Sequence, residues 1–273
     1  MSILSIDETL CTQDGLCAAE CPVGILYLKE GQTPRAVRSA GELCIRCGHC
    51  VAVCPTGAFN LKGMAAADCP PVRKEWKLSP EAAEHFLRSR RSVRNFKDAP
   101  ADKDALAELI RVASHAPSGH NSQPVSWIVV HEREKVRQLA GMVVDWMRWM
   151  LEHMEDQARA MHMDLVAASW DRGDDRVLRD APHLVVAHAP KAFPPSAAAC
   201  TLALGYLELY APALGLGTCW AGYFTAAATY WPPLAEKLAL PEGNAVFGAV
   251  MAGIPKWGYH RLPLRKKPKI EWK

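Results

Sequence analysis

Two runs of cysteines near the start of the chain hold the residues best suited to do chemistry. The second run ends in a Cys-Pro pair at Pro55 and contains Cys44, Cys47, Cys50 and Cys54. This is the spacing with which bacterial proteins hold iron–sulfur clusters. Zinc also binds Cys-x2-Cys pairs, but four cysteines so close together and the Cys-Pro ending favour iron and sulfide. Disulfides are disfavoured because nothing marks the chain for export.

An upstream run has the same register with one substitution. Its cysteines are Cys11, Cys17 and Cys21, and Asp14 stands where the second cysteine belongs. A carboxylate is a harder and weaker ligand for iron than a thiolate. Three readings of Asp14 follow. It ligates the fourth iron of a 4Fe–4S cluster, or that iron is lost and a 3Fe–4S cluster remains. In the third reading, Asp14 begins a turn at Asp-Gly and water or hydroxide completes the site. In each case we expect the cluster beside Asp14 to be more labile than a cluster held by four cysteines.

Together the two runs resemble a two-cluster bacterial ferredoxin, in which each run gives its last cysteine to the other cluster. The resemblance implies a 4Fe–4S cluster on Cys21, Cys44, Cys47 and Cys50. It implies a second cluster, 4Fe–4S or 3Fe–4S, on Cys11, Cys17 and Cys54 with Asp14 facing the fourth iron.

Size and composition indicate a globular protein of two domains. The chain has 273 residues, of which 49% are hydrophobic and 22% charged, and both shares are ordinary for soluble proteins. A net charge of +3 without a basic, aromatic-rich stripe argues against a nucleic-acid partner. The first ten residues lack the basic segment of a signal peptide. Because low-potential clusters need a reducing compartment, we expect a cytoplasmic protein.

One apolar stretch, residues 200–220, could be mistaken for a membrane span. It carries a single charge, Glu208, but also Pro212 and three glycines, and no Lys/Arg cluster flanks it. A buried helix ending near Gly215 explains the stretch better, so we expect no membrane.

Changes in composition and in hydrophobic periodicity along the chain predict an iron–sulfur domain at 1–63, a Pro-containing linker at 64–79 and a second domain at 80–273. Strands are expected in the first domain at 3–6, 25–28 and 58–61, and in the second at 127–131, 184–189 and 245–253. Helices are expected at 80–90 behind the cap Ser79, at 102–115, at 135–169, and from the cap Ser196 to Gly215. Helices around a modest sheet without regular β–α alternation indicate the α+β class.

The segment 90–96 follows the first of these helices and is rich in cations. On an extended segment Arg90, Ser92 and Arg94 face the same way. Two guanidinium groups around a hydroxyl suit a phosphate monoester. Taken alone, the segment is more often a solvated basic run.

Two further segments suit a planar ring. The loop 116–124 carries the side-chain amides of Asn121 and Gln123, each a donor and an acceptor like the edge of a flavin pyrimidine; an ordinary surface turn is the alternative. The glycine-rich segment 215–222 lacks the Gly-x-Gly-x-x-Gly spacing and follows a helix, which excludes Rossmann binding. Its glycines instead allow close approach of backbone to a flat ligand.

In sequence order, Arg-Arg-Ser-Val-Arg, Ala-Pro-Ser-Gly-x-Asn-x-Gln-Pro, Gly-Leu-Gly-Thr-Cys-Trp-x-Gly and a C-terminal Arg-Lys resemble the FMN-dependent nitroreductases over about residues 80–273. With the cysteine runs, nearly the whole chain resembles the ferredoxin-fused nitroreductases. The resemblance implies a nitroreductase-type α/β sandwich behind an N-terminal two-cluster ferredoxin-like domain. It also implies an intertwined homodimer with FMN at the subunit interface.

The same resemblance assigns cofactor contacts residue by residue. Those near the FMN phosphate and ribityl chain are Arg90, Arg91, Ser92, Arg94, Arg265 and Lys266. Asn121 would bind the pyrimidine edge. Those beside the isoalloxazine, with one backbone N–H near N5, are Trp220, Ala221, Gly222 and Tyr223. No side-chain nucleophile or base is required, so no catalytic residue is assigned. The chain departs from the family at Val125, where an aromatic is usual.

The expected function is a flavin- and iron–sulfur-dependent oxidoreductase. It would reduce a small electron-poor substrate, such as a nitroaromatic or a quinone, with electrons relayed by the clusters and supplied by NAD(P)H or a reduced ferredoxin. The alternative is an electron-transfer module that serves a protein partner and has no small substrate. Reductive dehalogenation and flavin fragmentation, both known in the wider superfamily, are a third option.

A Met- and Trp-rich stretch within 135–169 has two readings. Met147, Met150, Met154 and Met161 lie near one face of the expected helix, beside Trp146 and Trp149. Such a stripe is more often core or dimer packing, but adaptable methionines also suit a roof over a flavin and its varied substrates.

Overall fold

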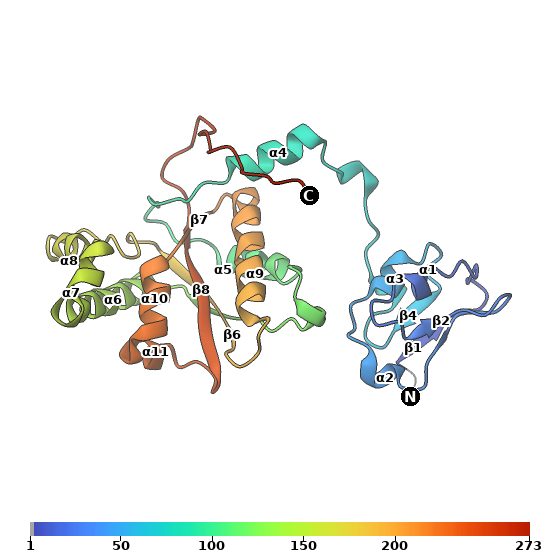
Figure 1. Ribbon diagram of the computed structural model, residues 1–273. Helices are drawn as coiled ribbons and strands as arrows, with labels where there is room; N and C mark the ends of the chain where they lie inside the picture. Colours follow the sequence, from blue (N-terminus) through green and yellow to red (C-terminus); the bar gives the residue numbers. More distant parts are fainter. Residues whose placement is uncertain (1–2) are drawn as a thin grey trace. The chain divides into compact units, whose positions relative to one another are not determined.

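The computed structural model describes residues 3–273 and separates into two compact units (Figure 1). Unit 1 runs up to Lys77 and includes Gly119–Ser122, and unit 2 comprises Leu78–Ser118 and Gln123–Lys273. The stretch expected to be a linker contains two short 3-10 helices, η1 (Ala66–Asp68) and η2 (Lys74–Trp76). The predicted domain limits at 63 and 79 stay a prediction; the contacts place a division between Lys77 and Leu78 and group Gly119–Ser122 with unit 1.

Unit 1 is built from two small antiparallel pairs and three short helices. The strands are β1 (Leu4–Ile6) paired with β4 (Phe59–Leu61), and β2 (Leu26–Tyr27) paired with β3 (Arg35–Ala36). The helices are α1 (Leu16–Ala19), α2 (Ala40–Leu43) and α3 (His49–Val53). The three expected strands are present, and β3 is an additional strand that was not expected from the sequence. Its core is small, with Phe59 as the largest fully buried side chain.

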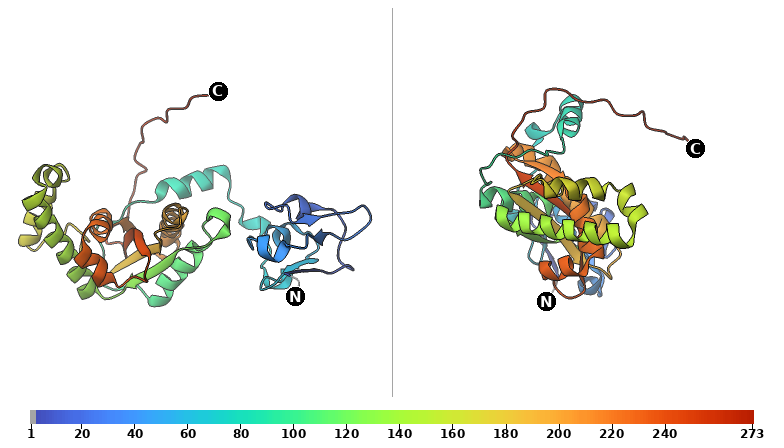
Figure 2. Two further views of the ribbon diagram at one scale, coloured as in Figure 1. Left: turned by 60° about the horizontal axis from the view of Figure 1, so that its bottom comes forward. Right: turned by 90° about the vertical axis from the view of Figure 1, so that its left-hand side faces the viewer.

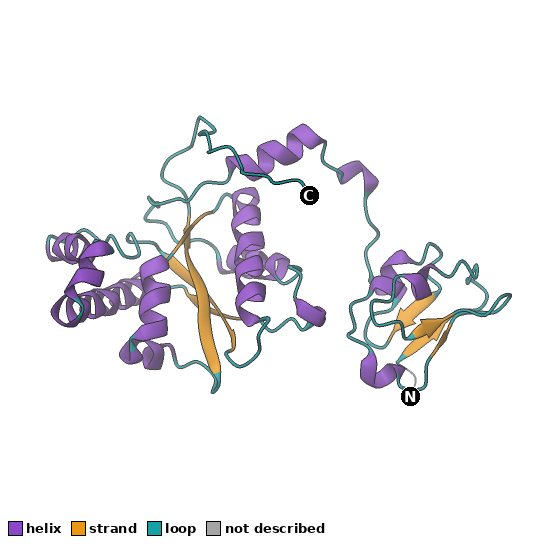
Figure 3. Ribbon diagram, in the orientation of Figure 1, coloured by secondary structure: helices purple, strands orange, loops and turns teal. Residues whose placement is uncertain are grey.

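Unit 2 is organised around one antiparallel sheet of four strands (Figure 3). In the order β5-β6-β8-β7 these are β5 (Ser126–Val130), β6 (His183–Pro190), β8 (Asn244–Gly253) and β7 (Gly217–Trp220). The two central strands are apolar along most of their length because both faces of the sheet are covered.

Helices cover both faces of this sheet, which gives the predicted α/β sandwich (Figure 2). Side chains alternate between the faces along β6. Val185 and Ala187 contact α5 (Lys103–Ala113) and α9 (Ser196–Tyr210) on one face. Leu184 and Val186 face the other side, which is covered by α6 (Arg133–His153), α8 (Met163–Asp171), α10 (Gly222–Tyr230) and α11 (Pro232–Leu238).

The helix predicted behind Ser79 is present, but the single long helix predicted over 135–169 is not. Helix α4 (Pro80–Ser89) begins after Ser79, whose side chain accepts the N–H of Ala82, and α5 begins after Asp102 in the same way. The expectation of one continuous helix over 135–169 was wrong. Its backbone leaves the helical region at Met154 (φ −144°) and at His162 (φ 57°), so the stretch forms α6, α7 (Glu155–Ala160) and α8.

The Met- and Trp-rich stretch divides accordingly. Met147, Met150 and Trp146 are buried in the core of unit 2. Met154 and Met161 are 38% and 43% exposed, and they lie beyond the end of α6. Core packing therefore explains the first part of the stripe only.

Helix α9 shows why the apolar stretch looked like a membrane span. Within residues 3–273, Ser196–Leu214 is the one helical segment long and apolar enough to cross a membrane. It packs on β6, β8 and α5, as expected of a core helix. It continues as η4 (Ala211–Leu214) and ends at Gly215, whose φ of 69° permits the turn. The predicted cap Ser196 is instead the first helical residue, and its Oγ donates to the carbonyl of Pro190.

The sequence missed β7, α10 and α11. Residues 215–222 looked like a glycine-rich turn because they carry little strand pattern of their own. Residues 217–220 of this segment form the strand β7, because each of them pairs with β8, from Gly217 opposite Gly253 to Trp220 opposite Val250. Tertiary pairing here overrides local propensity.

Two stacked histidines anchor the start of β6 to the segment before α5. The rings of His131 and His183 are 4.4 Å apart. The N–H of Ala101 donates to His183 Nε2, and His183 Nδ1–H donates to the carbonyl of His131, both at 2.8 Å. Burial lowers the pKa of His183, and the nearby His131 and Arg133 lower it further against the hydrogen bond to His131.

This arrangement predicts a pH-dependent stability. Because the folded pKa of His183 lies below its unfolded value of about 6.5, its contribution is complete above that pH and is lost as the pH falls below it. Urea unfolding followed by tryptophan fluorescence reports mainly on unit 2, which holds eight of the nine tryptophans. His183→Gln can accept from Ala101 and donate to His131 without titrating, so we expect a flatter profile below pH 6.5. Parallel losses of stability in both proteins would contradict this role.

Candidate cofactor sites

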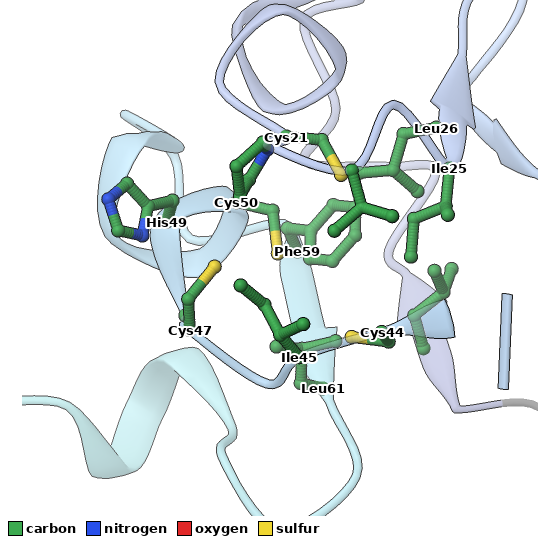
Figure 4. A pocket seen from close by; sticks show the side chains of 14 residues that line it. Cys21, Ile25, Leu26, Cys44, Ile45, Cys47, His49, Cys50, Phe59 and Leu61 are labelled. Carbon is green, nitrogen blue, oxygen red and sulfur yellow. The ribbon is translucent and has the colours of Figure 1, made fainter. Parts of the chain in front are cut away.

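Four cysteine side chains surround one cavity in unit 1 (Figure 4). They are Cys21, Cys44, Cys47 and Cys50. Their sulfurs point toward a common space between α3 and the loop before it, whereas the ring of His49 points away from it. The rest of the lining is almost wholly apolar and includes Ile25, Leu26 and Phe59. These are the four cysteines that the ferredoxin resemblance assigns to one cluster.

The apolar lining has an electrostatic consequence. Burial, together with the neighbouring Cys47 and Cys44, raises the pKa of the Cys50 thiol to about 11. Cluster iron binds thiolates, so ligation has to overcome this preference for the neutral thiol. The backbone N–H of Val51 opposes the shift, as expected of a loop that points donors at sulfur.

A second cavity in unit 1 is lined by Cys11, Asp14, Cys17 and Cys54. Burial raises the pKa of Cys17. Burial also acts on Cys54, but hydrogen bonds from Thr56, Phe59 and Ala58 outweigh it and lower the pKa of that thiol. The set again agrees with the crossed arrangement, since Cys54 comes from the downstream run.

The two cysteine runs share one backbone conformation. Gln13 and Arg46 both have positive φ, 58° and 52°, and each is followed two residues later by a left-handed glycine. Gly15 and Gly48 then begin α1 and α3 with nearly the same φ, 74° and 75°. Asp14 therefore occupies the same step of the loop as Cys47, and the substitution has not altered the loop.

The carboxylate of Asp14 is already engaged locally. Oδ1 accepts the N–H of Leu16 at 3.0 Å, and Oδ2 accepts the hydroxyl of Thr12 at 2.9 Å. The turn that one reading of Asp14 required is therefore present. A carboxylate has about four acceptor positions, so these two bonds leave capacity for iron, and ligation stays a prediction.

A single metal ion and an iron–sulfur cube require different spacings of their ligands. Among residues 3–273 no group of three or more His, Cys, Asp or Glu side chains is placed to hold one metal ion. A tetrahedral zinc site needs four ligand atoms within about 2.3 Å of a common point. Thiolates around an iron–sulfur cube stand farther apart, because each binds a different iron.

In unit 2, the phosphate segment (residues 90–94) lies alongside β7. The N–H of Val93 donates to the carbonyl of Thr218 at 2.8 Å, and Ser92 forms a parallel bridge with the same residue. Gly217 makes the approach possible, because an added Cβ would stand 2.4 Å from Val93 Cγ2 and 2.9 Å from Pro255 Cγ. The fold therefore brings two of the predicted flavin segments together.

The cations of the phosphate segment do not all face one way. Arg90 reaches the carboxylate of Glu208 at 3.4 Å. Arg91 faces a cavity of about 630 Å³ together with Lys97, Lys256 and Glu208. Arg94 is exposed, and its charge lowers the pKa of the Cys219 thiol against the larger effect of burial, which raises it. The segment remains rich in donors suited to a phosphate.

The ring segment (residues 220–223) spans the end of β7 and the start of α10. The N–H of Ala221 donates to the carbonyl of Ala249 at 2.8 Å and is thereby part of the sheet. The N–H groups of Gly222 and Tyr223 belong to the first turn of α10 and have no acceptor within the helix. They are the backbone donors that this segment can offer a ligand.

The loop predicted to hold the pyrimidine edge has an unusual backbone. His120, Asn121 and Gln123 all have positive φ, between 45° and 52°. Such conformations cost free energy and collect at functional sites. Gln123 N–H donates to Ser118 Oγ, and Asn121 lies on η3 (Gly119–Asn121), which groups with unit 1. There its amide donates to the carbonyls of Ile45 and Arg46.

The remaining predicted contacts lie on the C-terminal tail. Residues 261–273 are irregular, and Arg265 and Lys266 are exposed on them. The part of the tail that approaches the phosphate segment is Tyr259, whose hydroxyl donates to the carbonyl of Ser92 at 3.4 Å. Contacts of Arg265 and Lys266 with FMN stay predictions.

In the sequence, Glu208 stands out only as the lone charge in an apolar stretch, and no role was predicted for it. The structure places its carboxylate within reach of Arg90, Thr218 and Trp220. A single acid in a buried helix was the signal that could have found it, since charges are rarely buried without specific partners.

Fold and cavities define an oxidoreductase of two parts, an iron–sulfur domain and an α/β sandwich of the flavoprotein type. Two family models agree: a 4Fe–4S dicluster domain matches residues 10–59, and the nitroreductase family matches residues 87–254. The second match spans more than half of the chain. The chain belongs to the nitroreductase family.

Individual proteins similar to this chain carry names of different activities. An iodotyrosine deiodinase of Thermotoga neapolitana is 28% identical over 49% of this chain and 69% of its own. A putative NADH dehydrogenase/NAD(P)H nitroreductase of Archaeoglobus fulgidus is 26% identical over 63% of this chain and 84% of its own. A nitroreductase of Desulfitobacterium hafniense, solved with bound FMN, is 25% identical with a TM-score of 0.56, covering 71% of this chain and 99% of that one.

The role of Asp14 can be tested by completing the cysteine set. If Asp14 is the weak ligand, the aerobically prepared wild type should hold about seven irons per chain, with the EPR signal of a 3Fe–4S cluster. Asp14→Cys should hold about eight and lack that signal. Asp14→Asn keeps an acceptor for Leu16 but is a poorer ligand, and should lose the iron more readily. Equal iron contents and spectra in all three proteins would contradict the assignment.

Proposed function

We propose that the chain is an FMN- and iron–sulfur-dependent reductase of a small electron-poor substrate, such as a nitroaromatic or a quinone. The observation that carries the proposal is the presence of both kinds of site in one chain. Unit 1 gathers the predicted ligands around two cavities. In unit 2 the Val93–Thr218 hydrogen bond holds the phosphate segment against β7, the strand that leads into the ring segment.

The ligand sets follow from the cavity linings. Cys21, Cys44, Cys47 and Cys50 would hold one 4Fe–4S cluster. Cys11, Cys17 and Cys54, with Asp14 as a weak fourth ligand, would hold the other cluster. Bound clusters would supply one-electron transfer at low potential.

Most of the residues that would bind and orient FMN belong to unit 2, whereas Asn121 groups with unit 1. Arg90, Arg91, Ser92 and Arg94 would hold its phosphate and ribityl chain, joined by Arg265 and Lys266 of the tail. Asn121 would bind the pyrimidine edge. Of the ring segment, Trp220 and Ala221 would pass beside the isoalloxazine, while Gly222 or Tyr223 donates an N–H near N5. These N–H groups favour a reduced, anionic ring because they begin a helix, where the positive end of the dipole lies.

Bound FMN would supply hydride transfer, and the chain would supply placement and electrostatics. The arginines would stabilise negative charge without moving protons, since guanidinium does not deprotonate in proteins. No side chain of this chain is assigned to acid–base or nucleophilic chemistry.

A homodimer is the proposed assembly, with FMN at the subunit interface. Helix α4 is amphipathic yet has no buried residue, and Phe86 and Leu87 on it are exposed. In the tail, Leu264 and Trp272 are 93% and 89% exposed. Apolar surface of this extent at both ends of unit 2 suits a partner copy. The proposed location is the cytoplasm, where the clusters stay reduced.

Reductive dehalogenation is a second candidate function. It is favoured by the match to an iodotyrosine deiodinase, at 28% identity over 69% of that relative. An aryl iodide and a nitroarene both carry a flat aromatic ring that can stack on a flavin and be reduced there, so the same site could take either. The alternative of a relay with no small substrate would leave all such compounds unreduced.

Steady-state turnover under anaerobic conditions tests the proposal. The assay pairs NADPH, reduced ferredoxin or dithionite with a nitroarene, a quinone or 3-iodotyrosine. Cys50→Ser removes a cluster ligand, and Cys69→Ser is its control because Cys69 is exposed and outside both cavities. We expect Cys50→Ser to lower ferredoxin-driven turnover at least about tenfold and to spare dithionite-driven turnover, since dithionite reduces flavin directly.

Two results would count against it. Absence of turnover with every donor and substrate, in protein loaded with FMN and iron, would favour the relay. Turnover of 3-iodotyrosine alone would replace the nitroarene or quinone with a halogenated aromatic as the substrate class.

A further inference from the structure

Helix α9 carries one charged side chain, Glu208, in an otherwise apolar sequence. The residue is only 7% exposed. A carboxylate in such surroundings is tolerated when donors replace the water that it has lost. Its partners therefore show what this charge does in the fold.

Three donors converge on the carboxylate. Trp220 Nε1 donates to Oε2 at 2.6 Å, and Thr218 Oγ1 donates to Oε1 at 3.4 Å. Arg90 Nη1 donates to Oε1, also at 3.4 Å. Glu208 thus contacts the phosphate segment through Arg90 and the ring segment through Trp220, two stretches more than a hundred residues apart in the chain.

The bond to Trp220 fixes one end of its indole. The other end lies against β8, where a Cβ added to Gly248 would stand 2.9 Å from Trp220 Cζ3. The backbone of Trp220 is paired with Val250. The ring is therefore held at both ends, immediately before the residues whose N–H groups begin α10.

The contact with Arg90 is of a different kind. It is a single long bond, and the Arg90 side chain is 25% exposed. A guanidinium has five N–H donors, so this bond orients the group and leaves most donors for another acceptor. A dianionic phosphate is an acceptor that an arginine binds strongly.

We propose that Glu208 is a positioning residue for the flavin: its carboxylate holds Arg90 and Trp220 in the relative placement that FMN binding requires. The inference rests on the proposed FMN site and adds to it a residue that acts through these two partners. A purely structural ion pair would need neither the indole bond nor any effect on cofactor affinity.

The test measures the Kd for FMN of the full chain after flavin removal, by quenching of flavin fluorescence. Glu208→Leu removes all three bonds, and we expect FMN to bind about tenfold more weakly, which is ~1.4 kcal/mol. Glu208→Gln should retain most of the affinity, because its amide oxygen still accepts from Trp220. Trp220→Phe keeps a ring but loses the donor, so it should weaken binding as well. Combined with Glu208→Leu it should add little, since both changes remove the same bond.

Controls separate positioning from folding. Glu236→Leu makes the same change at an exposed position on α11 and should leave the Kd unchanged. Thermal unfolding of each flavin-free variant shows whether it is folded. If Glu208→Leu does not fold, Trp220→Phe decides alone, and an unchanged Kd overturns the proposal.

The two proposals fail in different ways. Wild-type protein that binds no FMN would refute the proposed function. Wild-type protein that binds FMN while Glu208→Leu binds it equally well would refute only the role of Glu208. Fully additive losses in Glu208→Leu and Trp220→Phe would also overturn it.

Discussion

Each cysteine-lined cavity of unit 1 takes its last cysteine from the other cysteine run. Cys21 lies with the downstream cysteines, and Cys54 lies with the upstream ones. Neither cavity is complete until both halves of the unit are folded. The unit has only two-stranded sheets and a small core, so little apolar burial is available to hold it together. We therefore expect cluster binding and folding to be coupled here, as in other small metal-binding domains.

Unit 2 also has to bring distant parts of the chain together, and it does so through its edge strand β7. The segments predicted to bind flavin are far apart in the chain, and β7 at the edge of the sheet brings them together. Thr218 accepts a backbone bond from Val93, and Gly217 leaves room for that approach. The adjoining N–H groups of α10 then stand next to the same edge. Glu208 reinforces the arrangement from the core side.

Local sequence signals predicted much of this. Ser79 caps the helix it was expected to cap, and the ferredoxin resemblance of the cysteine runs predicted which side chains share a cavity. What it missed depends on tertiary contacts. Strand β7 exists because β8 pairs with it, and the breaks at Met154 and His162 interrupt a sequence that is helical in its periodicity. The partners of Glu208 come from segments whose proximity no local pattern encodes. Asp14 is an intermediate case. Its place in the cysteine register could be predicted from the sequence, whereas its hydrogen bonds with Thr12 and Leu16 could not.

The central claim is that one polypeptide holds both inorganic clusters and a flavin. Anaerobic purification followed by assays of iron, acid-labile sulfide, zinc and FMN on the same sample tests it most directly. The account predicts about one FMN and about seven to eight irons per chain, with sulfide to match. A colourless protein with neither sulfide nor flavin, or one carrying zinc in place of iron, would contradict it.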